Sequence, residues 1–123
     1  MTKKILVVDD EAVLTKMIKM NLERTGNYEV RTENEGSNAL QAAREFKPDL
    51  IFMDVMMPDM GGDEAIAEIR EDDNLSSIPY VFMTAIVTKA ETEDLGSNIG
   101  GNEFLAKPVK TQELIEKIES ILG

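Results

Sequence analysis

The sequence predicts a doubly wound α/β fold in which five strands of a parallel sheet alternate with helices in three layers. Several short apolar runs are unbroken rather than alternating, which is typical of strands buried on both faces of a sheet. Between these runs, apolar residues recur at the spacing of amphipathic helices. Because parallel strands need helical crossovers, and these crossovers are right-handed, the alternation and the short connections favour a (βα)₅ chain.

The first half of the chain begins this alternation. Residues 5–8 are the first predicted strand, and a helix that ends near Gly26 follows it. The apolar face of this helix is made of Leu14, Met17, Ile18 and Leu22. A second strand is expected from Tyr28 to Thr32, and a second helix stops before Pro48, because a residue that precedes proline disfavours the helical conformation. The apolar face of the second helix is made of Ala39, Leu40, Ala43 and Phe46.

The second half continues with three further pairs of strand and helix. The strands are residues 50–53, 80–83 and 104–106. Residues 61–63 (Gly-Gly-Asp) offer a loop and an N-cap for the third helix, and Thr111 can cap the last one. The apolar faces of these two helices are made of Ala65, Ile66 and Ile69, and of Leu114, Ile115, Ile118, Ile121 and Leu122. Between them, a short and mostly solvated helix is expected from Thr88 to Ser97.

The composition describes one acidic domain. The chain has 123 residues, of which 42% are hydrophobic, so it can bury a single core without disulfides or metals. It holds 24 acidic and 13 basic residues, no histidine and no cysteine, and its net charge of −11 disfavours direct binding to DNA. No apolar stretch approaches the roughly 18 residues of a membrane span. We expect a cytoplasmic protein without membrane contact, formed by a single domain over residues 1–123 with no output domain.

Polar residues follow the predicted strands at their carboxyl ends. They are Asp9, Asp10, Asp54, Thr84 and Lys107. In an open parallel sheet these ends line a single crevice, so groups far apart in sequence can converge on one ligand. Two carboxylates ~4 Å apart repel each other by about 4 kcal/mol at an effective dielectric constant of roughly 20, and a hard cation such as Mg²⁺ offsets this repulsion. Mg²⁺, a lysine ammonium such as that of Lys107 and a threonine hydroxyl such as that of Thr84, placed around one free carboxylate, are what phosphoryl transfer to that carboxylate requires.

These residues and their surroundings resemble the receiver domain of two-component response regulators, the phosphoacceptor domain typified by the chemotaxis regulator. The match covers the whole chain, and the segments that carry it are Val8-Asp9-Asp10, residues 54–62 (Asp-Val-Met-Met-Pro-Asp-Met-Gly-Gly), Thr84-Ala85 and Lys107-Pro108. The resemblance implies a flavodoxin-like sheet in the strand order 2-1-3-4-5. It also implies a phosphohistidine donor on a sensor histidine kinase or a histidine phosphotransfer protein, so the lack of histidine in this chain is no objection.

The resemblance further implies a metal site and a phosphorylation site at the acidic residues. Asp54 is expected to be phosphorylated, and Asp10 and Asp54 are expected to bind Mg²⁺ directly. The backbone carbonyl of Met56 is expected as the third protein ligand, with Asp9 acting through a water molecule. A domain of this kind catalyses only its own phosphorylation and dephosphorylation, so we do not expect an enzyme that turns over a separate substrate.

The remaining roles that the resemblance implies concern the phosphoryl group and the switch. Thr84 and Lys107 are expected to contact the phosphoryl oxygens, and Phe104 is expected to move inward together with Thr84. The Lys107–Pro108 peptide is expected to be cis. Phosphorylation would shift a two-state equilibrium on the face formed by the fourth helix, the fifth strand and the last helix. We expect this face to bind a downstream protein, and the domain to be a monomer or a weak phosphorylation-dependent dimer.

Two departures from the family pattern have consequences. The positions two residues after Asp54 and Thr84 flank the phosphoryl group in this family, and here they are the apolar Met56 and Ile86. We therefore predict slower access of water to the phosphoryl group than with a polar pair. A phosphoryl lifetime unchanged by Met56→Asn and Ile86→Glu would count against this. The segment that follows Thr84 is also one residue longer than usual, at residues 100–101, which leaves the register of the fourth helix open.

Other interpretations of the same residues stay open. Asp10 could cap the first helix, the Thr84 hydroxyl could bond to nearby backbone, and Phe104 could fill the core. An enzyme similar to the haloacid dehalogenase-like phosphatases would place an Asp-x-Asp pair after the first strand, whereas this chain has adjacent Asp9 and Asp10 and no inserted cap domain. A flavodoxin-like binder of a flavin phosphate would need a phosphate-binding loop after the first strand. Here the three acidic residues at positions 9–11, which end with Glu11, would repel the phosphate.

Overall fold

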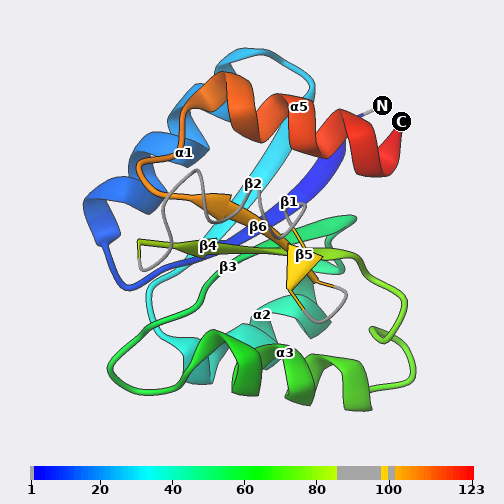
Figure 1. The fold of residues 1–123 in the computed structure, drawn as a ribbon. Helices are drawn as coiled ribbons and strands as arrows, with labels where there is room; N and C mark the ends of the chain where they lie inside the picture. The colour runs from blue at the N-terminus through cyan, green and yellow to red at the C-terminus, as the bar shows by residue number, and fades with distance from the viewer. Residues whose placement is uncertain (1, 86–97, 100–101) are drawn as a thin grey trace.

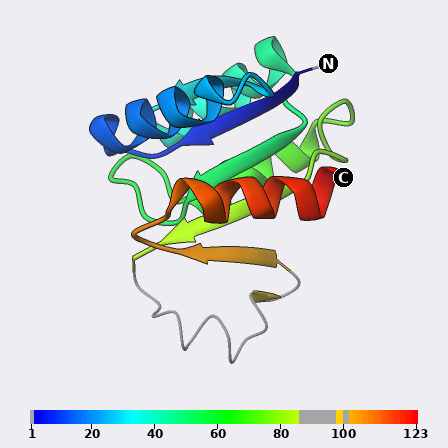
Figure 2. The ribbon, with the colours of Figure 1, turned by 90° about the horizontal axis from the view of Figure 1, so that it is seen from above.

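The computed structural model describes residues 2–85, 98–99 and 102–123. The strands are β1 (Lys3–Val8), β2 (Tyr28–Glu33), β3 (Leu50–Asp54), β4 (Tyr80–Thr84), β5 (Asn98–Ile99) and β6 (Asn102–Ala106). The helices in these ranges are α1 (Ala12–Arg24), α2 (Ala39–Phe46), α3 (Gly62–Glu71) and α5 (Thr111–Leu122), with a 3-10 turn, η1, at Gly36–Asn38. One sheet lies between α1 and α5 on one face and α2 and α3 on the other (Figure 1, Figure 2). Among the described residues, we find no helix with the length and apolarity needed to cross a membrane.

The topology of the sheet confirms the predicted strand order. The parallel strands follow one another as β2-β1-β3-β4-β6, so β6 is the predicted fifth strand. The two-residue β5, which the sequence did not predict, adds an antiparallel pair beside β6. The helix predicted from Thr88 to Ser97 lies outside the described residues. In register, Met53 pairs with Val8 on one side and with Phe82 on the other, so the carboxyl ends of β1, β3 and β4 lie side by side.

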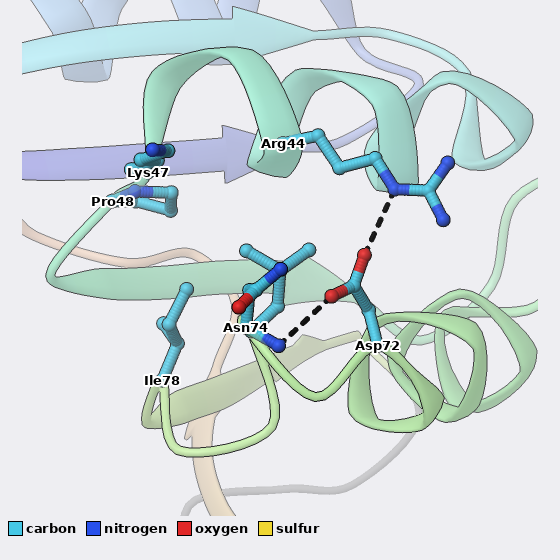
Figure 3. Close-up of a pocket in the computed structure, with 7 residues that line it drawn as sticks. Arg44, Lys47, Pro48, Asp72, Asn74 and Ile78 are labelled. Carbon is cyan, nitrogen blue, oxygen red and sulfur yellow. Dashed lines mark hydrogen bonds and ion pairs between the residues drawn. The ribbon is translucent and has the colours of Figure 1, made fainter.

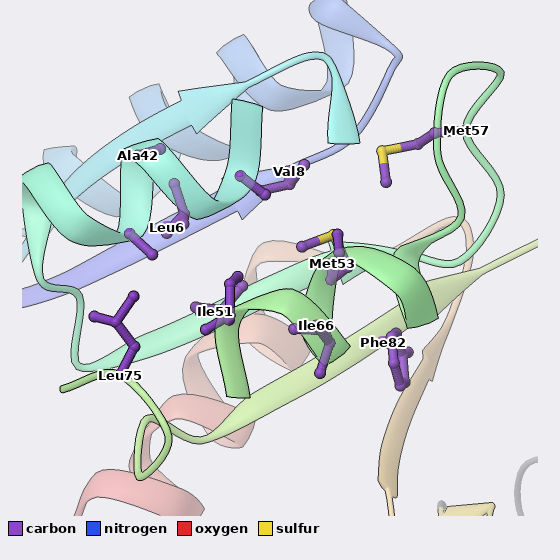
Figure 4. Packing of buried hydrophobic residues seen from close by; sticks show 13 residues of the cluster. Leu6, Val8, Ala42, Ile51, Met53, Met57, Ile66, Leu75 and Phe82 are labelled. Carbon is purple, nitrogen blue, oxygen red and sulfur yellow. The ribbon is translucent and has the colours of Figure 1, made fainter. Parts of the chain in front are cut away.

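The inner strands bury both of their faces, which explains the unbroken apolar runs. In β3, Ile51 and Met53 belong to the core beneath α2 and α3 (Figure 4), whereas Leu50 and Phe52 belong to the core beneath α1 and α5. All four side chains are fully buried. Because burial of one such side chain contributes roughly 1.5–3 kcal/mol, the two cores hold the strand ends in place for the site.

The buried face of α1 differs from the prediction at two positions. Leu22 is buried as predicted, but Met17 is 49% exposed, and Thr15 is buried. The Thr15 hydroxyl donates to the backbone oxygen of Ala12 at 3.1 Å and accepts a hydrogen bond from Asn34 Nδ2 at 2.9 Å. Because its hydroxyl is satisfied, a threonine can take a place that helical spacing assigns to an apolar residue.

The start of α5 also differs from the prediction. Thr111 is the first helical residue, and Lys110 takes the N-cap position. The Thr111 hydroxyl accepts a hydrogen bond from Asn21 Nδ2 of α1 at 3.2 Å, and no side chain of the N-cap residue caps the helix. The Glu113 carboxylate accepts the backbone N–H of Lys110 at 3.3 Å. A contact between two helices therefore occupies the group that the sequence assigned to the cap.

An ion pair joins α2 and α3 near the amino ends of β3 and β4. Arg44 Nε lies 2.9 Å from Asp72 Oδ2, and the Asp72 carboxylate also accepts the backbone N–H of Asn74 at 2.9 Å (Figure 3). Because the Arg44 side chain is about half exposed, this pair contributes at most about 1 kcal/mol. The pair borders a hollow of about 650 Å³ lined by Arg44, Lys47, Pro48, Asp72, Asn74, Leu75 and Ile78. None of these residues follows the carboxyl end of a strand, so the hollow is separate from the acidic residues of the predicted site.

Candidate functional site

Three carboxylates meet at the carboxyl end of the sheet. Asp9 and Asp10 follow β1, and Asp54 ends the neighbouring strand β3. One carboxylate oxygen from each residue lies within 4.8 Å of those of the other two. Asp9 and Asp54 are buried, whereas Asp10 is exposed. The structure therefore brings the predicted acidic residues together, with two of them out of water and one at the surface.

Lys107 is the cation of this cluster. It follows β6, and its backbone N–H donates to the Thr84 carbonyl oxygen at 2.9 Å. Its Nζ lies 2.7 Å from Asp9 Oδ2, and 3.3 Å from both Asp54 Oδ1 and Glu11 Oε1. Glu11 was not among the predicted site residues, although its place in a run of three acidic residues was a signal for it. One ammonium therefore faces two buried carboxylates and one exposed carboxylate.

Burial shifts the protonation equilibria of this cluster. The pKa of the Asp54 carboxyl is raised to about 6, mainly by burial and then by the negative charge of Asp9, while Lys107 acts in the opposite direction. Burial also raises the pKa of Asp9, which the hydrogen bond from Lys107 partly offsets. Burial disfavours the charged form of Lys107, but attraction by the carboxylates outweighs this and raises the pKa of the ammonium. The cluster therefore holds negative charge that a further cation would stabilise.

The arrangement of the three carboxylates fits Mg²⁺, which takes one or two carboxylates and keeps several waters. Asp10 is exposed, so a cation bound beside it could keep water ligands. Both oxygens of Asp9 already have partners, because Oδ1 accepts the backbone N–H of Glu11 at 2.9 Å and Oδ2 faces Lys107. An indirect contact of Asp9 with the cation, through water, agrees with this geometry.

Thr84 and Phe104 lie on neighbouring strands beside the cluster. Thr84 ends β4, is buried, and pairs in register with Ala106 of β6. Phe104 is half-buried and packs against the core, with its ring centroid 5.4 Å from that of Phe82. Phe104 therefore has a packing role, and its movement as a switch stays a prediction.

The loops around the cluster hold the remaining predicted positions. The Met56 side chain is 63% exposed just after β3, and its carbonyl as a metal ligand stays a prediction. The peptide bond between Lys107 and Pro108 is cis. Ile86 lies outside the described residues. Asp10 is not the cap of α1, because the N-cap residue is Glu11 and no side chain caps that end.

Gly62 allows α3 to begin directly against β3. Its backbone N–H donates to the Val55 carbonyl oxygen at 2.9 Å, and a Cβ at this position would collide with the backbone carbonyl of Asp54. The helix begins at Gly62 with Gly61 as its N-cap, inside the segment of residues 61–63 that the sequence predicted for the loop and the cap. The close approach requires glycine here and sets the path of the chain after Asp54.

Comparisons with known proteins add a family match and two relatives. A family model described as the response regulator receiver domain matches residues 5–119. The polar-differentiation response regulator DivK of Brucella anthropi is 35% identical over 123 residues, which cover 100% of this chain and 98% of DivK. The alkaline phosphatase synthesis transcriptional regulatory protein PhoP of Bacillus subtilis is 39% identical over 124 residues, which cover 99% of this chain. The chain spans 49% of PhoP, about half of its length.

Solved structures share the fold over nearly the whole chain. The chemotaxis protein CheY4 of Vibrio cholerae has a TM-score of 0.82 and 29% identity, with coverage of 98% of this chain and 99% of that chain. The receiver domain of the sensor histidine kinase PA1611 from Pseudomonas aeruginosa has a TM-score of 0.80 and 30% identity, with coverage of 98% and 97%. That receiver structure contains a magnesium ion coordinated in its active site cleft.

Proposed function

The chain belongs to the family of response regulator receiver domains, and from that premise we propose that Asp54 accepts a phosphoryl group in two-component signalling. The position of Asp54 carries this proposal: its buried carboxylate lies 3.3 Å from Lys107 Nζ, at the edge of the acidic cluster. The proposed cofactor is Mg²⁺, and the residues that would hold it are Asp10, Asp54 and the Met56 carbonyl, with Asp9 acting through water.

In the proposed transfer, an oxygen of the Asp54 carboxylate attacks the phosphorus of a phosphohistidine in line. The new P–O bond forms as the P–N bond breaks, and the imidazole nitrogen keeps the bonding electron pair and leaves. Lys107 stabilises the negative charge of the phosphoryl oxygens, and the Thr84 hydroxyl donates a hydrogen bond to them. Mg²⁺, when bound, supplies further positive charge at these oxygens. The proposed phosphohistidine donor is a sensor histidine kinase or a histidine phosphotransfer protein, as the family resemblance implies, which agrees with the lack of histidine in these 123 residues.

The domain then catalyses only its own phosphorylation and dephosphorylation. Dephosphorylation requires a water molecule to reach the phosphorus of the aspartyl phosphate. The apolar residue Met56 is exposed directly after β3, two residues from Asp54, at a position that flanks the phosphoryl group in this family. With apolar Met56 and Ile86 at the two flanking positions, water should reach the phosphoryl group more slowly than it would beside a polar pair.

A face of α1 is the proposed docking surface for the phosphohistidine donor. Three apolar residues of this helix are exposed: Val13, Met17 and Met20. Their spacing places them on one side of the helix, and the cations Lys16 and Arg24 are exposed on the same helix of an otherwise acidic protein. A hollow of about 360 Å³ has both Met17 and Lys107 in its lining, so the face leads to the site. A donor with an apolar ridge flanked by acidic residues would fit here.

The output surface is proposed at β6 and α5, together with the predicted fourth helix. α5 carries Glu113, Glu116 and Glu119, with Lys117 as the opposing charge among them, which favours basic residues on a downstream protein. Phosphorylation of Asp54 would shift this surface between two states through Thr84 and Phe104. We also propose that the protein is located in the cytoplasm, and that it is a monomer or forms a weak dimer only when it is phosphorylated.

Intact mass after incubation with acetyl phosphate and Mg²⁺ tests the phosphoacceptor role. Wild type should gain one phosphoryl group. The gain should be lost in Asp54→Ala and reduced in Asp10→Ala or with a chelator, because Asp54 is the acceptor and Asp10 a metal ligand. Asp73→Ala, which removes an exposed carboxylate far along the chain from the cluster, is the matched control and should be phosphorylated like wild type.

The alternative functions give different outcomes in the same preparation. A phosphatase similar to the haloacid dehalogenase family would release phosphate from a small substrate over many turnovers, rather than stop at one phosphoryl group. A flavin binder would show absorbance in the flavin bands after purification. A phosphoryl gain that persists in Asp54→Ala would contradict the assignment of Asp54 as the acceptor.

A further inference from the structure

The connection between β2 and α2, residues 34–38, contacts both loops that carry the proposed metal ligands. We call residues 34–38 the bracket segment. At its start, the Asn34 side-chain amide donates to the backbone carbonyl oxygen of Asp9 at 2.8 Å and to the Thr15 hydroxyl at 2.9 Å. The turn that contains Asp9 and Asp10 is thereby tied to the bracket segment through a backbone atom, which leaves both carboxylates available to the site.

The other end of the bracket segment holds the loop after β3. Asp59 Oδ2 accepts the backbone N–H of Ser37 at 2.9 Å, and Asp59 Oδ1 accepts that of Gly36 at 3.2 Å. These hydrogen bonds lower the pKa of the Asp59 carboxyl, and the bond from the Ser37 backbone has the largest effect. The carboxylate therefore stays ionised, and the hydrogen bonds to it are charge-assisted. This loop also contains Met56, three residues before Asp59.

Packing at Gly36 closes the contact between the bracket segment and this loop. A Cβ at Gly36 would lie 3.0 Å from Met57 Cε and 3.0 Å from the Met60 carbonyl oxygen, so the backbone of the segment rests directly on the loop. Gly36 and Met57 are both buried. The loop after β3 is therefore held to the bracket segment by hydrogen bonds from one side and by apolar packing from the other.

On the basis of the function proposed above, we propose that Asn34 and Asp59 are positioning residues for cation binding. Through the bracket segment they set the distance between the Asp9-Asp10 turn and the Met56 carbonyl. Neither residue contacts the cation. Outer partners that orient ligands in this way typically change metal affinity by about 10–100-fold when they are removed.

The proposed coupling must act in both directions. If the closed bracket segment favours cation binding by a given factor, cation binding favours the closed segment by the same factor. Mg²⁺ should therefore slow hydrogen exchange of the Gly36 and Ser37 amides, which donate to Asp59 and are remote from the cation in sequence. A role of Asp59 in fold stability alone would leave the local opening of these two amides independent of Mg²⁺, because the cation would then slow only the exchange that requires global unfolding.

The experiment measures the Kd for Mg²⁺ by isothermal titration calorimetry on the whole chain, free of phosphoryl donors. Asn34→Ala and Asp59→Ala should each raise the Kd by about tenfold. Asp59→Asn is included because it removes the charge and one acceptor while keeping the size of the side chain. Asp73→Ala removes the same charge elsewhere and should change the Kd by less than about twofold in 0.15 M salt, since exposed charges are screened.

Amide exchange followed by NMR provides the second readout. In wild type, Mg²⁺ should slow exchange at Gly36 and Ser37, and in Asp59→Ala this slowing should disappear. Wild-type Kd values in both Asn34→Ala and Asp59→Ala, with binding still abolished by Asp10→Ala, would overturn the bracket proposal and leave the proposed function intact. Failure of the wild-type chain to bind Mg²⁺ would overturn both.

Discussion

At the scale of single residues, the site without a bound metal ion places two buried carboxylates and one exposed carboxylate, that of Glu11, around a single ammonium. Lys107 lies between Asp9 and Asp54, and it also reaches Glu11 at the surface. It cannot compensate all three charges, and burial raises the pKa of Asp54 to about 6. The ionised carboxylate of Asp54, the proposed acceptor, therefore destabilises the fold when no metal ion is bound.

We predict that Asp54→Asn stabilises the chain at pH 8 in the presence of a chelator. The pKa of Asp54 rises from 3.8 to about 6 on folding, so between these values the folded state binds more protons than the unfolded chain. Wild-type stability should fall as the pH rises through this window and remain low above it. The free energy of unfolding of Asp54→Asn should exceed that of wild type by about 1–3 kcal/mol at pH 8, measured by urea denaturation.

The pH series provides the internal control for this prediction. The curves of wild type and Asp54→Asn should approach each other as the pH falls through the window and converge below pH 3.8, where Asp54 is mostly protonated in both states of the wild-type chain. Asp73→Asn, at an exposed position, should follow wild type at every pH. A wild-type chain that is as stable as Asp54→Asn at pH 8 would mean that Lys107 compensates the charge in full.

At the scale of elements, α1 combines a structural face with an exposed apolar face. Its buried side packs Ile18 and Leu22 into the core, and its other side exposes Val13, Met17 and Met20. A helix needs only one apolar face to pack on a sheet, and a second one next to the site is typical of an interaction surface. The exposure of Met17 corrects the sequence prediction and also supports the proposed docking face.

We predict that Met17→Ala slows phosphoryl transfer from a protein donor but not from a small one. The test uses a phosphorylated histidine kinase or phosphotransfer protein that transfers to wild type in a screen. Loss of the Met17 contact should lower kcat/KM by about fivefold or more, if it acts as a binding hot spot. The rate with acetyl phosphate should be unchanged, since Met17 does not contact the acceptor. Ser120→Ala, on α5, is the matched control, and an equal loss with both donors would contradict docking on α1.

At the scale of the whole molecule, the net charge of −11 and the carboxylate cluster act together. The folded chain concentrates three carboxylates at one point, whereas the unfolded chain separates them. A divalent cation therefore has a binding site in the folded state alone, and it should stabilise the whole domain by mass action. Sodium at the same ionic strength would screen the surface charges without binding the cluster.

We predict that Mg²⁺ raises the free energy of unfolding of wild type by about 2.7 kcal/mol at a concentration 100 times its Kd. Thermal or urea denaturation in MgCl₂ and in NaCl of equal ionic strength measures the difference. Asp10→Ala should lose most of the Mg²⁺ effect and keep the NaCl effect. Equal stabilisation of wild type by the two salts would show that charge screening, rather than a specific site, is responsible.

The sequence by itself determined the type and order of the five parallel strands and of the described α-helices, and the residues of the central cluster apart from Glu11. Unbroken apolar runs indicated strands buried on both sides, as in β3, because period and length depend on local sequence. The convergence of Asp9, Asp54, Thr84 and Lys107 could be predicted because parallel strands bring their carboxyl ends to one side of the sheet. The strand order followed from the family resemblance that these residues carry.

The tertiary structure alone decided the rotation of helices and the contacts between segments distant in sequence. Thr15 rather than Met17 faces inward, because Asn34 satisfies the Thr15 hydroxyl. The Thr111 hydroxyl bonds to α1 instead of capping its own helix. Two further contacts also join separate loops: the ion pair of Glu11 with Lys107, and the hydrogen bonds that Asp59 accepts from the bracket segment. Periodicity specifies which element a segment forms, whereas these partners depend on which neighbours the packed core brings within hydrogen-bonding distance.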